Sequence, residues 1–205
     1  MVSLAVKDPS LDPAIIEAAR AEFQEHGFQK ASLHKIADRA GITTGALYTR
    51  YRNKDALFRS LVVPALEGIR DQLPATQALY DEARQHRDRK LLMKAICQEE
   101  QIYLDLLYEH YEDCVLLFCK STGSSIDAAM SRLMSQKARQ TVEFFRSIAT
   151  RPLDCDGIQL IISNQFFCYR QILDQGCSKE KARSCLQTLN IFLEAGWEAI
   201  FDQLF

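Results

Sequence analysis

Residues 31–57 read ASLHKIADRAGITTGALYTRYRNKDAL, and this stretch decides the fold. Its apolar residues recur every three or four positions in two short runs, which Gly41 separates. Ser32 and Thr43 each precede one run, where a side-chain oxygen can accept a hydrogen bond from a free helical N–H group. The pattern predicts two short helices, 33–40 and 44–50, joined by a tight turn as a helix-turn-helix.

Further helices are expected on both sides of this motif. Asp12 begins the first helix and Gly27 provides its left-handed stop. Asn53 caps a helix that starts at Lys54 and runs past a proline to about Pro74. Residues 75–90 are polar and mixed in charge, and they form either a surface connection or an exposed continuation of that helix.

The remaining sequence shows the same helical periodicity, and its eight glycines and five prolines leave long uninterrupted segments. We predict an all-α protein with two domains. Residues 1–60 form a three-helix DNA-binding domain that contains the helix-turn-helix. Residues 61–205 form a larger helical domain, with helices from Leu91, around 111–119, over 126–150 and over 156–175, and a last one capped by Ser178.

The charge distribution points to a phosphate-binding surface. The whole chain has a formal net charge of −2, but residues 28–59 contain seven basic and two acidic residues. A basic patch on an otherwise acidic chain is typical of a module that binds nucleic acid.

Individual residues of the motif have side chains suited to DNA. Hydroxyl, ammonium and guanidinium donors suit phosphate oxygens, whereas residues on the outer face of the second short helix suit base edges. The phosphate-binding candidates are Ser32, Thr43, Tyr48, Arg50 and Lys54, and the base-reading candidates are Thr44, Gly45 and Thr49. Two alternatives stay open: Arg50 and Lys54 could belong to a solvated charged face, and Tyr48 could be a core aromatic residue.

Several classes of protein are disfavoured. No apolar run reaches the roughly 20 residues of a membrane span, and the N-terminus lacks a secretion signal, so a cytoplasmic location is expected. Seven cysteines without a C-x-x-C pair indicate reduced thiols. No nucleophile–base pair, phosphate loop or carboxylate dyad occurs, which predicts a protein that is not an enzyme and has no cofactor. His110 and Cys114 could share a soft metal, but no other ligand joins them, and no metal site is predicted.

The two closing helices carry a long apolar stripe that is broader than one neighbouring helix requires. We expect these helices to pair with their copies in a second subunit and form a four-helix bundle. The predicted interface residues are Ile161, Ile172, Leu189, Leu193, Trp197 and Phe201.

Residues 16–28, 32–41 and 42–57 resemble the tetracycline-repressor (TetR) family of bacterial transcriptional regulators. This resemblance implies a homodimeric repressor that a small molecule releases from a pseudo-palindromic DNA operator. The family's DNA contacts map onto Ser32, Thr43, Thr44, Gly45, Tyr48, Arg50 and Lys54. The chain departs from the family at Thr44, where lysine is frequent, and at Arg50, where histidine is common.

In such a domain, aromatic side chains after residue 61 either line an effector pocket or fill the core. As a set they indicate an apolar or aromatic effector. The predicted pocket residues are Tyr103, Tyr111, Phe118, Phe144, Phe166 and Tyr169. The alternative to a regulator is a helical sensor that binds a metal or reacts through its thiols, or a partner-docking protein.

Overall fold

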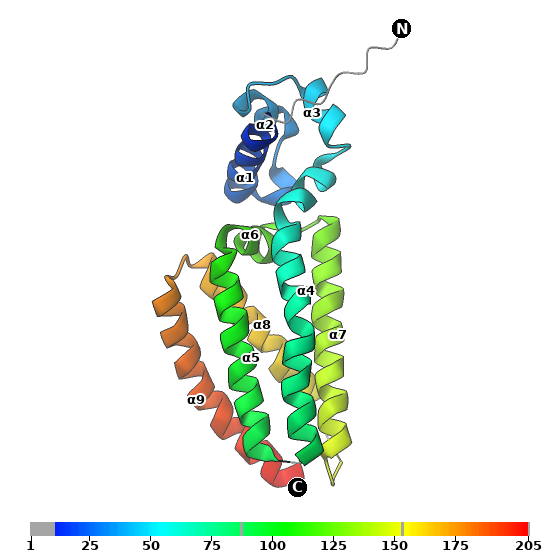
Figure 1. The fold of residues 1–205 in the computed structure, drawn as a ribbon, viewed down its shortest axis with the longest axis vertical. Coiled ribbons are helices and arrows are strands. Elements are labelled where there is room, and N and C mark those ends of the chain that lie inside the picture. Colours follow the sequence, from blue (N-terminus) through cyan, green and yellow to red (C-terminus); the bar gives the residue numbers. More distant parts are fainter. Residues whose placement is uncertain (1–10, 87, 153, 205) are drawn as a thin grey trace. The chain divides into compact units, whose positions relative to one another are not determined.

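A computed structural model describes residues 11–86, 88–152 and 154–204, and every regular element in these ranges is a helix (Figure 1). The all-α prediction is confirmed. None of the described helices is long and apolar enough to cross a membrane. The elements are α1 (Leu11–Lys30), α2 (Leu33–Arg39), α3 (Thr44–Arg50), α4 (Lys54–His86), α5 (Arg89–Glu109), α6 (Tyr111–Val115), the π-helix η1 (Leu116–Lys120), α7 (Ser125–Ile148), α8 (Cys155–Asp174) and α9 (Lys179–Leu204).

The structure selects the helical continuation that was one of two alternatives after Pro74, and it changes one predicted boundary. Helix α4 continues through Pro74 to His86, so the polar segment up to that residue extends the helix. Burial of Tyr80 and Ala83 in the core stabilises this extension against the cost of the proline. The single helix expected around 111–119 is instead α6 followed by η1.

The chain forms two compact units. The small unit contains the described residues up to Pro64 together with Glu112–Ala128, and the large unit contains Ala65–Tyr111 and the described residues from Ala129 onward. Helix α6 from Glu112 onward and all of η1 therefore belong to the small unit, although the predicted division at residue 60 places them in the second domain. The division into a DNA-binding and an effector-binding domain stays a prediction.

Aromatic packing holds the small unit together. The ring of Phe23 on α1 lies 5.0 Å from the ring of Phe58 on α4, and Phe28 lies 5.3 Å from the same ring. Gly27 has a φ of 69° and a ψ of 167°, which only glycine adopts without strain, and it kinks α1 so that Phe28 reaches this cluster. Ile36 of α2 and Leu47 of α3 are buried beneath the two short helices.

The core of the large unit draws side chains from α4, α5, α7, α8 and α9, which Figure 1 shows as long helices. Trp197 of α9 stacks on Phe145 of α7 at a centroid distance of 5.0 Å, and Phe201 lies 5.7 Å from the same ring. These aromatic contacts join the last helix to the middle of its own unit.

This packing corrects part of the predicted subunit interface. Trp197, Phe201 and Ile172 are 3%, 1% and 7% exposed within a single chain, so they are core residues and cannot present a surface to a partner. Ile161, Leu189 and Leu193 are half-buried beside the core clusters. Helical periodicity shows which face is apolar, but it does not show whether the same chain or another one covers that face.

Candidate functional site

Helix α3 presents a polar face that its own hydrogen bonds hold in place. The Thr43 hydroxyl oxygen accepts a hydrogen bond from the backbone N–H of Ala46 at 3.1 Å, as predicted for an N-cap. The Thr49 hydroxyl donates to the Gly45 carbonyl at 3.0 Å. Leu47 anchors the helix on its buried side.

The predicted DNA-binding residues divide by exposure. Thr43, Gly45, Tyr48 and Thr49 are exposed, whereas Ser32, Thr44, Arg50 and Lys54 are half-buried. Tyr48 is 51% exposed, which rules out the alternative that it is a core aromatic residue.

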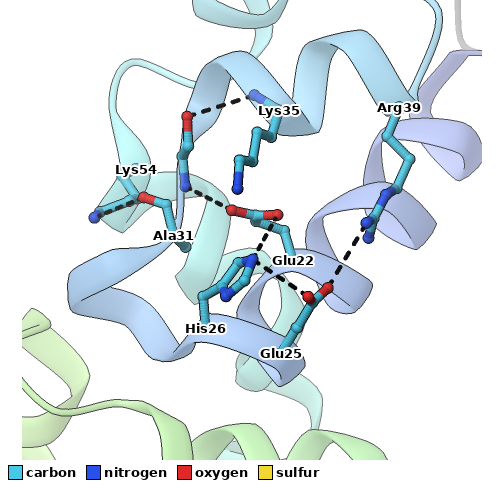
Figure 2. Close-up of polar contacts among 8 residues, drawn as sticks. Glu22, Glu25, His26, Ala31, Lys35, Arg39 and Lys54 are labelled. Carbon is cyan, nitrogen blue, oxygen red and sulfur yellow. Dashed lines mark hydrogen bonds and ion pairs between the residues drawn. The ribbon is translucent and has the colours of Figure 1, made fainter.

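A buried carboxylate positions the start of α2. Glu22 on α1 is 1% exposed, and its Oε1 accepts a hydrogen bond from the Ser32 backbone N–H at 2.9 Å. His26 Nε2 lies 3.7 Å from the other Glu22 oxygen and 3.6 Å from Glu25 Oε1 (Figure 2). The sequence prediction missed Glu22. The available signal was an acidic residue within the apolar stripe of the first helix, beside Phe23.

Arg50 and Lys54 are both engaged inside the small unit. Arg50 Nε donates to Asp12 Oδ1 at 3.1 Å, and the arginine side chain is only 7% exposed. Lys54 Nζ donates to the backbone carbonyls of Gln29 at 3.0 Å and Ala31 at 3.1 Å, and lies 4.8 Å from the centre of the Phe28 ring. Arg50 therefore does not lie on a solvated charged face. Lys54 satisfies carbonyls at the end of α1, and one of its three N–H donors remains for a phosphate.

Other basic residues keep the surface of this unit positive. The exposed ones between residues 28 and 59 are Lys30, Lys35, Arg39, Arg52 and Arg59. Arg39 lies 3.8 Å from Glu25 (Figure 2). The positive charge near α3 thus comes chiefly from residues that were not predicted to contact DNA.

The large unit encloses a cavity of about 50 Å³ between side chains of α4, α5, α7, α8 and α9. Three predicted pocket residues line it: Tyr103, Phe166 and Tyr169. The other three lie elsewhere, because aromatic residues in a sequence do not reveal which face each occupies. Tyr111 stacks on Tyr108, Phe144 packs edge-on against Tyr80, and Phe118 belongs to η1 in the small unit.

Two adjacent glutamates give the cavity a charged wall. Glu99 Oε1 pairs with Lys137 Nζ at 2.6 Å, and Glu99 Oε2 accepts a hydrogen bond from the Tyr80 hydroxyl at 2.6 Å. Glu100 Oε1 accepts a hydrogen bond from Asn190 Nδ2 at 2.7 Å. The sequence prediction missed this polar wall, although Glu99 falls in register with the apolar face of α5.

Burial shifts the proton equilibria of the cavity wall. Desolvation raises the pKa of Glu100 to about 7, and the hydrogen bond from Asn190 opposes that rise. Desolvation likewise raises the pKa of Tyr103 to about 12 and raises the pKa of Tyr169. The phenols remain protonated at neutral pH, whereas Glu100 exchanges a proton near pH 7.

The three cysteines whose pKa is shifted are not activated thiols. Burial raises the pKa of Cys114 to about 12 and also raises the pKa values of Cys97 and Cys168, which disfavours the reactive thiolate. Across the described residues, no three His, Cys, Asp or Glu side chains converge as a metal site.

The described chain combines a small unit that contains a helix-turn-helix with a larger helical unit. Residues 15–61 match the bacterial regulatory proteins of the tetR family. A probable acrEF/envCD operon repressor of Escherichia coli (strain K12) is 31% identical over 103 residues, which cover 48% of this chain and 47% of that protein. The transcriptional regulator TtgR of Pseudomonas putida is 37% identical over 68 residues, which cover 33% of this chain and 32% of TtgR.

Solved structures share the fold over most of the chain. A TetR-like regulator from Rhodococcus sp. RHA1 has a TM-score of 0.57 at 18% identity and covers 91% of this chain and 96% of its own. MexZ of Pseudomonas aeruginosa has a TM-score of 0.53 at 18% identity, and the match covers 94% of this chain and 95% of MexZ. In sequence, however, the match spans only about half the length of the E. coli relative. It spans a smaller share of the other curated relatives, such as TtgR.

We predict that Lys54→Met lowers the free energy of unfolding by about 1–3 kcal/mol, because two carbonyls lose a charged donor. Chemical denaturation monitored by circular dichroism measures this change. Arg59→Met is the matched control, since this exposed residue follows on the same helix and should change stability by less than about 0.5 kcal/mol. Equal effects of the two substitutions would contradict a capping role for Lys54.

A second prediction concerns the pH dependence of stability. Because its pKa is raised on folding, Glu100 binds more protons in the folded chain than in the unfolded one between about pH 4.5 and 7. Its contribution to stability is therefore lost as the pH rises through this window. Glu100→Gln should raise the melting temperature at pH 8 by about 2–4 °C, given the partial solvation of the site, and by less at pH 5. A difference that is constant with pH would contradict the shifted pKa.

Proposed function

We propose that the chain is a homodimeric transcriptional repressor that binds a pseudo-palindromic operator on double-stranded DNA and is released by a small molecule. It would act in the cytoplasm and without catalysis of its own. The observation that carries the proposal is the capped, outward-facing α3, which lies within the residues that match the tetR family. The E. coli relative described as a probable operon repressor supports the same reading.

In this proposal α3 enters the major groove of DNA. Thr44, Gly45 and Thr49 face base edges, and Tyr48 lies between bases and backbone. Phosphate contacts come from Ser32 and Thr43 at the helix N-termini, from Arg50 and from the remaining donor of Lys54. A helix of seven residues is only about 10 Å long, so specific binding requires a second copy one helical turn of DNA away.

An exposed apolar face on α8 and α9 supports dimerisation. Leu160 and Phe167 on α8 are 73% and 54% exposed, and Ile191 and Phe192 on α9 are 73% and 74% exposed. Large apolar side chains exposed on two helices are costly to leave in water, and a second copy would cover them. Half-buried Leu189 and Leu193 would border this interface, which replaces the buried residues of the sequence prediction.

The effector would occupy the cavity beside Tyr103, Phe166 and Tyr169. Helix α4 contributes residues to both units, from Lys54 in the small unit to His86 in the large one. An effector that binds better to one arrangement of α4 than to another would change the spacing of the two α3 helices and so the affinity for DNA. The proposed division is thus DNA binding by residues 1–60, and effector binding and dimerisation by 61–205.

The DNA-binding proposal predicts sequence-specific binding to the DNA that flanks the protein's own gene. Tyr48→Ala should weaken this binding by about tenfold or more without lowering the melting temperature, because the side chain is largely exposed. Fluorescence anisotropy of labelled DNA at constant salt measures the affinity.

His34→Ala is the control for that experiment, since His34 is an exposed residue of the neighbouring α2 and has no proposed DNA contact. Binding that does not exceed that to unrelated DNA, even at low salt, would refute the proposal and favour a partner-docking protein.

For the dimer, Phe192→Glu should convert the chain to a monomer, because the charge would be buried in an apolar interface. Sedimentation velocity gives the mass directly. Ser135→Glu places the same charge on an exposed position of α7 and should leave the dimer intact. A Phe192→Glu protein that still sediments as a dimer would show that this face is not the interface.

A further inference from the structure

The two glutamates of the cavity wall differ in how their charge is balanced. Glu99 has a lysine ammonium and a phenol hydroxyl as partners, at 2.6 Å each. Glu100 has the neutral amide of Asn190, and among the described residues no lysine or arginine lies within ion-pair distance of it. A carboxylate that lines a cavity without a cation is a site for a positive charge supplied from outside.

The side chains around Glu100 favour a cation of a particular kind. Tyr103, Phe166, Tyr169 and Trp197 line the same cavity, and aromatic faces attract organic cations while accommodating apolar groups. The indole N–H of Trp197 is buried and has no hydrogen-bond partner among the described residues, so it remains available to an acceptor atom of a ligand.

We propose that the cavity binds an organic cation with an aromatic or apolar body, whose positive nitrogen lies at Glu100 and whose body packs among Tyr103, Phe166 and Tyr169. This ligand class rests on the effector role proposed above for the cavity. Ionised Glu100 would gain a counter-charge that no described lysine or arginine supplies, and Glu99 would keep Lys137.

The size of the cavity sets the scale of the first probes. Its volume of about 50 Å³ is far below the roughly 300–1,000 Å³ of ordinary ligand pockets, so side chains must move when a ligand enters. A small probe demands the least movement. Phenyltrimethylammonium and tert-butylbenzene have nearly the same shape and differ in charge, which isolates the contribution of the cation.

The chain carries its own reporter for this experiment. Trp197 is its single tryptophan and lines the cavity, so its fluorescence should respond when a ligand enters. The 205-residue chain is titrated with phenyltrimethylammonium, with tert-butylbenzene and with the anion benzenesulfonate at constant ionic strength. We expect the cation to bind about tenfold or more tightly than its neutral isostere, and the anion to bind least tightly.

Two variants identify the residue responsible. Glu100→Gln keeps the shape and removes the charge, and should weaken cation binding by about tenfold while leaving tert-butylbenzene binding nearly unchanged. Glu109→Gln, an exposed position on the same helix, is the matched control and should behave as wild type. Circular dichroism and the melting temperature confirm that each variant is folded.

Equal affinity for the cation and its isostere would overturn the ligand class, as would a Glu100→Gln protein that keeps the preference for the cation. A parallel measurement of DNA affinity separates this proposal from the proposed function. Cation binding that depends on Glu100 but leaves DNA affinity unchanged would support the ligand class and refute the regulatory coupling.

Discussion

The small unit depends on side chains that satisfy the backbone groups at the ends of its helices. Helices α2 and α3 have seven residues each, too few to be stable in water by themselves. Glu22 accepts from the N–H of Ser32, Thr43 accepts from the first turn of α3, and Lys54 donates to the last carbonyls of α1. These contacts and the aromatic cluster around Phe23 hold α3 in one orientation, which a helix that reads DNA requires.

The contacts that hold these helices in place also determine which basic side chains keep their charge available at the surface. Arg50 and Lys54 help to hold the unit together, through Asp12 and through the end of α1, so their charge is partly committed within the unit. In the proposed complex, the positive potential that attracts DNA phosphates would come largely from exposed residues such as Arg52 and from the N–H groups at the start of α3. Counting basic residues in a sequence does not make this distinction.

Local signals in the sequence predicted local structure well. The caps at Ser32, Thr43 and Asn53 are where the sequence placed them, because capping depends on a few neighbouring residues. Predictions that need the tertiary arrangement were less reliable. The stripe of α9 predicted Trp197 at a subunit interface, whereas its ring stacks on Phe145 of the same chain. Helical periodicity does not predict that Phe192 is exposed. It also does not predict that Glu100 has no lysine or arginine partner among the described residues.

In the proposed mechanism, occupancy of the cavity and binding of DNA are coupled through one chain. Linkage requires this coupling to be reciprocal: the factor by which a ligand weakens DNA binding must equal the factor by which DNA weakens ligand binding. The direct measurement is the affinity for phenyltrimethylammonium with and without saturating operator DNA, beside the affinity for DNA with and without saturating phenyltrimethylammonium. We predict the same factor, greater than one, in both directions. Affinities that are independent of the other ligand would contradict the claim.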